Sequence, residues 1–228
     1  MAARTACTWH FIQNRTMLHY HTIPVTPFQQ NCSILWCDQT MEGAVVDPGG
    51  DLPRLLAFAE KQGITLRQIL LTHCHVDHCA GTAELSGKLD LPIIGPHEGD
   101  QYWIDALPAT AVNYGFPPAA TFTPTRWLHD GDTVQVGNST LQVRHCPGHT
   151  PGHVVFYSPE ANRAFVGDVL FAGSIGRTDF PGGDYDTLIA SITQRLWPMG
   201  NDTVFIPGHG PESTFGRERV SNPFVAGT

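Results

Sequence analysis

Alternating and continuous apolar runs divide the chain into many short segments, most of which have the length and period of β-strands. Such runs predict strands at residues 19–25, 31–37, 43–46, 66–71, 92–95, 133–136, 140–144, 153–157, 163–166 and 204–206. Apolar residues at helical spacing predict three helices, over residues 52–62, 80–89 and 185–196. Asp51 and Asp184 stand where helix caps belong, and Gly63 stands where the first helix should stop. We expect the ordered pattern to end with the strand at residues 204–206.

The order of these elements is strands, helix, strand, helix, followed by a looser copy of the same order. Strand-rich halves with amphipathic helices between them indicate an α+β fold, in which two sheets pack face to face with helices outside. Residues 97–127 are irregular and aromatic, and we expect part helix and part loop wall beside a site. No linker-like stretch interrupts the pattern, which predicts one domain over residues 17–228. Residues 1–16 are predicted to be a disordered extension.

Composition narrows the class of partner. The 228 residues are 41% hydrophobic and 15% charged, with a formal net charge of -8 and no cluster of Lys or Arg. Because nucleic-acid binding needs clustered cations, a nucleic-acid partner is disfavoured. No apolar run is long enough to span a bilayer, so a membrane partner is disfavoured as well. The six cysteines show no CxxC pairing, which favours reduced thiols in a cytoplasmic protein over disulfides.

Candidate chemistry concentrates directly after the predicted strand at residues 66–71. Here His73, His75, Asp77 and His78 follow one another within a single turn. Neutral imidazole and carboxylate are ligands for zinc and similar divalent ions. The alternative is a polar loop whose histidines face water, but crowding several imidazoles without a partner is costly. The cluster therefore predicts a metal site.

Three later positions repeat this design, since each puts a potential ligand beside glycine near the end of a strand. They are His149, Asp168 and His209. Loops at strand ends are where a sheet scaffold places functional groups, and an adjacent glycine lets the backbone approach a bound ion. Asp168 alone would pass for a turn residue, but its place between the two histidines favours a ligand. The other seven histidines are expected to be structural or exposed, with supporting roles open to His145 and His153.

The H-x-H-x-D-H motif and the later ligands, in this order, resemble the metallo-β-lactamase fold superfamily. The resemblance implies a four-layer αββα sandwich of two mixed sheets with a site for two metal ions, Zn²⁺ above all, with iron and manganese as alternatives. It implies that His73, His75 and His149 hold one ion and that Asp77, His78 and His209 hold the other. Asp168 would bridge them. Two such ions favour a shared hydroxide that attacks a carbonyl carbon, and Asp77 is expected to orient it.

The segment over residues 167–180 resembles the glyoxalase II branch through its G-D-x-L-F and G-R-T-D-F runs, especially the short bacterial YcbL-type proteins. That resemblance implies hydrolysis of S-(2-hydroxyacyl)glutathione, such as S-lactoylglutathione, to glutathione and a hydroxy acid. Arg177 is a candidate partner for a substrate carboxylate. A salt bridge with Asp179 that fixes the loop is the equal alternative. Larger enzymes of the branch add a basic helical domain for glutathione, which this sequence is expected to lack.

Other functions stay open on the same residues. The branch also contains persulfide dioxygenases, which would use one iron held by His73, His149 and Asp168. Hydrolysis of a lactone or β-lactam is a weaker third reading. In a non-catalytic alternative the ions only stabilise the fold, although structural zinc sites are usually closed and rich in cysteine. The oligomeric state is expected to be monomer or homodimer.

Overall fold

The first sheet carries the N-terminal half of the site. The computed structural model describes residues 17–227, so the extension predicted over residues 1–16 lies outside the described residues. This sheet has the order β1-β2-β3-β4-β5, with β3, β4 and β5 parallel and the other neighbours antiparallel. Its strands are β1 (Leu18–Val25), β2 (Gln30–Cys37), β3 (Glu42–Val46), β4 (Thr65–Leu70) and β5 (Ile93–Ile94).

The second sheet carries the C-terminal half of the site and has the order β13-β12-β9-β8-β7-β6. Only β12 and β9 pair in parallel, so this sheet is mixed as well. Its strands are β6 (Thr133–Val136), β7 (Ser139–His145), β8 (Val154–Ser158), β9 (Arg163–Gly167), β12 (Val204–Pro207) and β13 (Ser213–Thr214). A separate short hairpin consists of β10 (Leu170–Phe171) and β11 (Ser174–Ile175).

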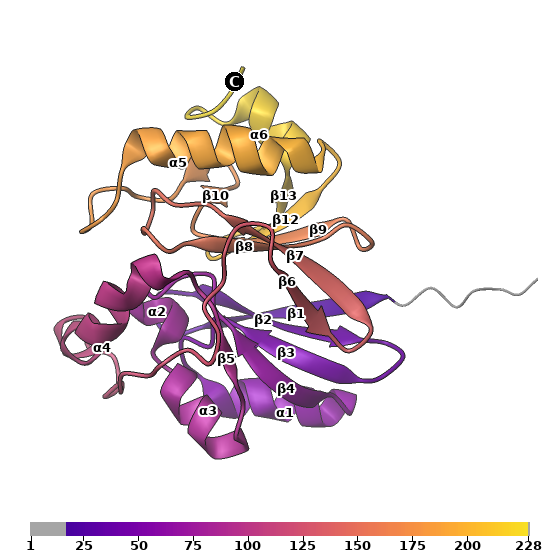
Figure 1. The fold of residues 1–228 in the computed structure, drawn as a ribbon, viewed down its shortest axis with the longest axis vertical. Coiled ribbons are helices and arrows are strands. Elements are labelled where there is room, and N and C mark those ends of the chain that lie inside the picture. Colours follow the sequence, from indigo (N-terminus) through magenta and orange to yellow (C-terminus); the bar gives the residue numbers. More distant parts are fainter. Residues whose placement is uncertain (1–16, 228) are drawn as a thin grey trace, which may run out of the picture.

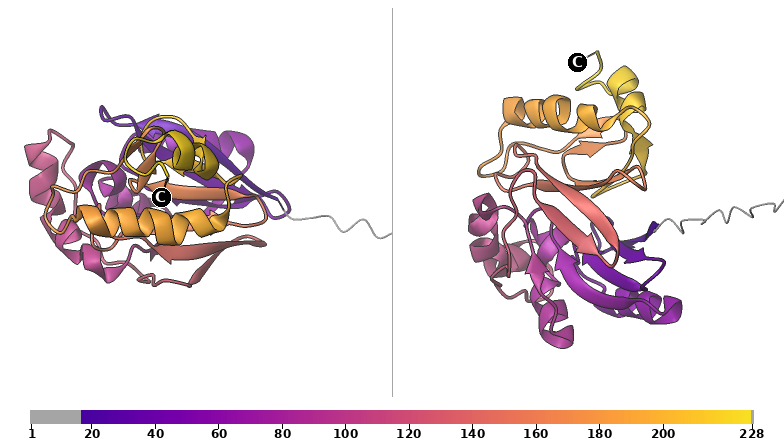
Figure 2. Two further views of the ribbon diagram at one scale, coloured as in Figure 1. Left: turned by 90° about the horizontal axis from the view of Figure 1, so that it is seen from above. Right: turned by 45° about the vertical axis from the view of Figure 1, so that its right-hand side comes forward.

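Helices cover the outer face of each sheet, as Figures 1 and 2 show. On the first sheet these are α1 (Leu52–Gln62), α2 (Val76–Cys79), α3 (Thr82–Leu89) and α4 (Gln101–Asn113). On the second sheet they are α5 (Tyr185–Ser191), continued by a π-helical turn (Ile192–Leu196), and α6 (Phe215–Ser221). The expected αββα sandwich of two mixed sheets is therefore confirmed.

Three apolar clusters hold these four layers together. The middle cluster joins the inner faces of the two sheets and includes Leu35, Leu70, Phe156 and Phe165. Strands buried between a second sheet and a helix layer are apolar on both faces, which explains their continuous apolar runs. The outer clusters lie beneath α1, α3 and α4 on one side and beneath α5 and α6 on the other.

The helix ends test the predicted caps. Gly63 ends α1 with a left-handed backbone (φ 69°), and the Asp184 carboxylate accepts a hydrogen bond from the Thr187 N–H at the start of α5. Both predictions are confirmed. The predicted cap at Asp51 is wrong, because its carboxylate accepts from the Thr26 N–H at 2.9 Å and makes no cap bond to α1. Asp51 therefore fixes the turn at residues 26–29 instead.

The prediction that order ends at residues 204–206 is also wrong, because β13 and α6 follow. The inner face of α6 buries Phe215 together with Glu218, so its buried positions lack an apolar helical period. Glu218 accepts hydrogen bonds from the Ser213 hydroxyl and from the Gly173 N–H at 2.7 Å. A buried carboxylate satisfied in this way leaves no hydrophobic signal in the sequence. Through Gly173 it also fixes the hairpin of β10 and β11.

Residues 97–127 contain α4 followed by an irregular stretch, as expected, and Trp103 on α4 faces the site. Among residues 17–227, no helix combines the length and the apolar character needed to cross a membrane.

Candidate metal centre

The turn after β4 holds the first four candidate ligands. Thr72, the residue before His73, is tied to Asp47 on the neighbouring strand connection, whose carboxylate accepts from the Thr72 N–H at 2.7 Å and from its hydroxyl at 2.6 Å. His73 and His75 precede α2, and Asp77 and His78 lie in its single turn. The parallel neighbours β3 and β4 both end at this edge, so the loops after them meet there.

The second sheet delivers the other three candidates to the same edge. His149 lies in the loop between β7 and β8, Asp168 directly follows β9, and His209 directly follows β12 and Gly208. The Val154 N–H donates to the Thr72 carbonyl at 2.8 Å, which fixes one sheet's loop against the other's. At Gly208 a β-carbon would collide with the Asp168 carboxylate and the His78 ring. Glycine is therefore required beside this ligand for close backbone approach.

All seven predicted side chains converge. The ligand atoms of His73, His75 and His149 lie within 4.8 Å of one another, and their rings are buried. The ligand atoms of Asp77, His78 and His209 form a second group within the same limit. The structure thus brings together the same two sets of three that the resemblance implies.

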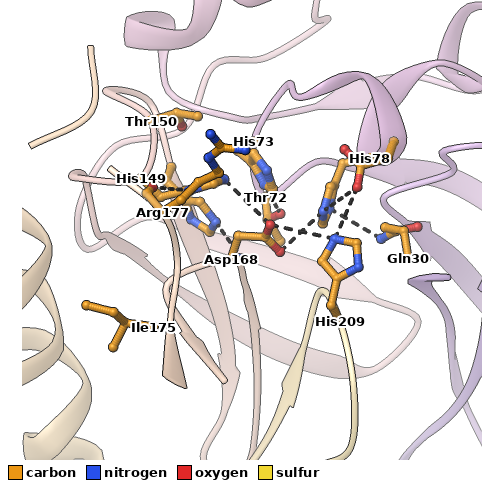
Figure 3. A network of polar contacts seen from close by, with 12 residues as sticks. Gln30, Thr72, His73, His78, His149, Thr150, Asp168, Ile175, Arg177 and His209 are labelled. Atoms are coloured by element: carbon orange, nitrogen blue, oxygen red, sulfur yellow. Dashed lines mark hydrogen bonds and ion pairs between the residues drawn. The ribbon is translucent and has the colours of Figure 1, made fainter. Parts of the chain in front are cut away.

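Asp168 lies between these two groups (Figure 3). One of its carboxylate oxygens is 3.3 Å from Nε2 of His78. The other oxygen is 3.6 Å from Nε2 of His149 and 3.7 Å from Nε2 of His209. A carboxylate whose two oxygens together face histidines of both groups has the arrangement that a bridging ligand needs.

The hydrogen bonds of the imidazoles test whether these residues fit a metal. Nδ1 of His149 donates to the Arg177 carbonyl at 2.8 Å, and Nδ1 of His209 donates to the Phe28 carbonyl at 3.2 Å. Nδ1 of His78 lies 3.0 Å from the Asp47 carboxylate. With the proton held at Nδ1, the Nε2 lone pair is free for an ion, which is the usual support of metal-binding histidine.

Buried ligand atoms without a hydrogen-bond partner are the second indication that these residues fit a metal. Nε2 of His73, His75, His78 and His149 and one oxygen of Asp168 are buried without a hydrogen-bond partner. In native structures, buried polar atoms without a hydrogen-bond partner are rare. A bound ion is one explanation for such atoms. A divalent metal is that explanation here, because four of these atoms belong to the two ligand groups and the fifth belongs to Asp168, which lies between them.

Burial and charge set the protonation of the cluster. Burial and the neighbouring imidazoles lower the pKa of His73 and of His75 well below the ordinary value, so both are neutral ligands. Although burial would raise it, the pKa of Asp168 is held well below its usual range by the imidazoles of His78 and His149. His73 and His75 therefore offer neutral nitrogens and Asp168 an ionised carboxylate, the forms that bind cations. Although burial would lower it, the pKa of His78 is raised well above its usual value by the carboxylates of Asp168 and Asp77, so this imidazole has to release a proton when an ion binds.

A buried carboxylate that the sequence did not single out joins the two ligand loops. Asp100 accepts from the Cys74 N–H at 2.9 Å, in the first loop. In the second loop it accepts from the Thr150 hydroxyl at 3.0 Å and from the Gly152 N–H at 2.6 Å. Burial raises the pKa of Asp100 to about 6. Asp100 thus positions the loop of His73 and His75 against the loop of His149.

Three further residues support the loops of the centre, and the sequence signals for them differ. Asp47 directly follows a buried strand beside glycines, the same signal that marked the ligands. The rule that selected the candidate ligands could therefore have selected Asp47 as well. His153, for which a supporting role was left open, accepts the Asp168 N–H at 3.1 Å and stacks on the His73 ring at 4.6 Å. His145 donates to the Pro151 carbonyl, also in the His149 loop.

Arg177 lies at the rim of this centre and is paired with Asp179. Its guanidinium donates to the two carboxylate oxygens at 2.7 and 2.6 Å and covers the Phe180 ring at 3.9 Å. More than half of the Arg177 side chain is exposed. The salt bridge of the alternative interpretation is therefore present, and its exposure leaves the guanidinium accessible to a ligand.

Comparisons with known proteins agree with this geometry. Residues 25–209 match the model of the metallo-beta-lactamase superfamily. The chain is 43% identical over 209 residues to the hydroxyacylglutathione hydrolase GloC of Haemophilus influenzae, an alignment covering 91% of this chain and 98% of that protein. It is 30% identical over 190 residues to the mitochondrial persulfide dioxygenase ETHE1 of Homo sapiens, covering 81% and 67%.

Solved structures show the same relationship. The structure of BLEG-1 B3 metallo-beta-lactamase matches with a TM-score of 0.84 and 36% identity, over 92% of this chain and 100% of that one. The structure of TTHA1623 in a di-iron-bound form matches with a TM-score of 0.81 and 38% identity, over 90% and 99%.

Proposed function

The chain belongs to the metallo-β-lactamase superfamily, and from this premise we propose that it hydrolyses S-(2-hydroxyacyl)glutathione to glutathione and a 2-hydroxy acid. S-lactoylglutathione is the representative substrate. The observation that carries the proposal is the convergence of Asp168 with two ligand groups in which four buried Nε2 atoms lack a hydrogen-bond partner. The 43% identity to a hydroxyacylglutathione hydrolase supports the choice of thioester.

The residues of the centre have different roles in the proposed hydrolysis. Divalent ions held by His73, His75 and His149 and by Asp77, His78 and His209 would supply a water of lowered pKa and would polarise the thioester carbonyl oxygen. Asp77, with a carboxylate oxygen 3.1 Å from Nε2 of His209, orients the attacking water. The water oxygen bonds to the carbonyl carbon, the C–S bond breaks, and the thiolate of glutathione leaves and takes up the proton that the water gives up. The neutral imidazoles of His73 and His75 and the ionised Asp168 can bind ions without first losing protons.

We propose zinc as the resident metal, with iron and manganese as alternatives, because imidazole and carboxylate groups suit all three. The di-iron form of a relative with 38% identity supports iron as an alternative. We also propose a cytoplasmic location. Its support is that Cys32, Cys37, Cys74, Cys79 and Cys146, the cysteines among the described residues, are buried and unpaired.

Metal analysis together with activity tests this function. Elemental analysis of the purified protein is expected to find two metal equivalents per chain, and a chelator is expected to abolish S-lactoylglutathione hydrolysis. Adding back zinc, iron or manganese separately should restore activity and identify the competent metal. Hydrolysis that survives complete metal removal would refute the mechanism.

Persulfide oxidation is the second candidate, and the relationship to human persulfide dioxygenase favours it. It would need one iron held by His73, His149 and Asp168. One iron per chain with oxygen uptake on glutathione persulfide would support this candidate. The second group of Asp77, His78 and His209 favours hydrolysis, since one iron leaves that group without a role.

Arg177 is expected to bind a carboxylate of glutathione, and paired variants separate this role from loop bracing. Because exposed salt bridges contribute little, a substrate carboxylate can compete with Asp179 for the guanidinium. Arg177→Met is expected to raise KM for S-lactoylglutathione about tenfold with little change in kcat, as for the loss of a charged hydrogen bond. Asp179→Asn breaks the same salt bridge but should not raise KM. Equal defects in both variants would assign Arg177 to bracing the loop.

A further inference from the structure

The cleft that opens onto the candidate metal centre has aromatic walls. Its volume is about 790 Å³, which suits a small-molecule substrate. The aromatic residues that line it come from four separate segments and are Phe28, Tyr102, Trp103, Tyr114, Phe171 and Phe180. Aromatic side chains of this kind bind apolar groups by burial and by ring contacts.

Cationic side chains that could bind the carboxylates of a hydrophilic ligand are scarce in this cleft. Among the described residues that line it, Arg177 is the one Lys or Arg side chain, and it is paired with Asp179. A neighbouring hollow of about 420 Å³ shares Phe28 and Tyr114 with the cleft, and its ionisable lining residues are the acids Asp51 and Glu84. Glutathione carries two carboxylates and few apolar groups, so it does not match the aromatic surface. That surface requires an apolar group elsewhere in the substrate.

The aromatic rings nearest the candidate ligands indicate which part of the substrate they meet. Trp103 lies edge-on to His75 with ring centroids 4.4 Å apart, and Phe180 lies 5.3 Å from the same ring. Phe171 lies 6.2 Å from His209. A thioester carbonyl at the centre carries the acyl substituent on one side and the glutathione sulfur on the other, and of these two the acyl substituent is the one that can be apolar enough to match the rings. The glutathione half extends farther from the ligands.

We propose that the cleft selects 2-hydroxyacyl thioesters with an aryl or similarly large apolar acyl substituent over those with a methyl group. The inference rests on the proposed function, because it takes glutathione as the thiol half. S-mandeloylglutathione and S-lactoylglutathione are a matched pair for it, since they differ by a phenyl group in place of a methyl group and share the leaving group.

Steady-state kinetics tests this selectivity. The value of kcat/KM for S-mandeloylglutathione is expected to exceed that for S-lactoylglutathione by about tenfold or more, mainly through KM. Phe171→Ala removes one wall ring and should lower the ratio of the two kcat/KM values at least about threefold. Tyr185→Ala is the control, because Tyr185 is an exposed aromatic residue that does not line the cleft. Equal kcat/KM values for both substrates in an active enzyme would overturn the inference and leave the proposed function standing.

Binding of stable thioethers gives a readout that needs no turnover. By calorimetry, S-benzylglutathione is expected to bind about tenfold more tightly than S-methylglutathione, and Phe171→Ala should narrow this difference. If neither thioester is hydrolysed, the proposed function fails, while the two thioethers still test the aromatic wall. Equal affinities for them would overturn the inference in that case as well.

Discussion

Asp168→Ala is expected to remove both metal equivalents from the protein and to lower kcat/KM for S-lactoylglutathione on the order of 10³-fold or more. Asp168 faces His78 with one oxygen and His149 and His209 with the other, at 3.3 to 3.7 Å. Its loss takes the shared carboxylate from both groups at once. It also removes the negative charge that favours cations among five crowded imidazoles.

Metal content measured beside activity decides this prediction. Asp186→Ala is a suitable control, because Asp186 is an exposed carboxylate in the first turn of α5, outside both ligand groups. It should keep both metal equivalents and full activity. Circular dichroism would show whether the Asp168 variant stays folded. A folded Asp168 variant that keeps two metal equivalents would contradict the bridging role.

Asp77→Ala is expected to have a more selective effect, with loss of about one of the two metal equivalents and a fall of roughly 10²- to 10³-fold in hydrolysis. Asp77 lies 3.1 Å from His209 and 3.8 Å from His78, whereas His73, His75 and His149 form a separate group. The substitution therefore weakens one group and leaves the other intact. It also removes the carboxylate that we propose orients the attacking water.

The same variant separates the two candidate enzymes. A persulfide dioxygenase that depends on His73, His149 and Asp168 should keep its iron and its oxygen uptake when Asp77 is replaced. Elemental analysis, thioester hydrolysis and oxygen consumption, all measured on one preparation, give distinct patterns for the two enzymes. Unchanged hydrolysis in Asp77→Ala would exclude the proposed role of this residue.

Local signals in the sequence predicted most of the fold and the members of the candidate centre. Buried strands appear in the sequence as apolar runs, and a loop begins where each run ends. His73, His149, Asp168 and His209 could therefore be assigned to strand ends. That they meet at one edge of the sandwich came from a family resemblance. Spacing alone does not place His149 beside His73, because their loops come from different sheets.

Long-range polar contacts were the part that the sequence did not reveal. Asp100 bonds to Cys74 and Thr150, which are 26 and 50 residues away. Its own neighbours in the sequence carry no periodic pattern. Asp51 met every local rule for a helix cap, yet its carboxylate is used by Thr26. The hydrogen-bond partner of a carboxylate depends on which donors the tertiary fold places next to it. Local propensity does not contain that information.

The candidate centre draws its ligands from both halves of the sandwich, with His73, His75, Asp77 and His78 beside the first sheet and the other three beside the second. Neither half can hold a complete group, since each group includes one histidine from the second sheet. Metal binding would therefore stabilise the packed arrangement of the two halves, in addition to the apolar cluster that joins their sheets. Ions that bind only the docked state add about 4 kcal/mol of stability at a thousandfold excess over Kd. Cellular metal supply would then govern the lifetime of the folded chain as well as its activity.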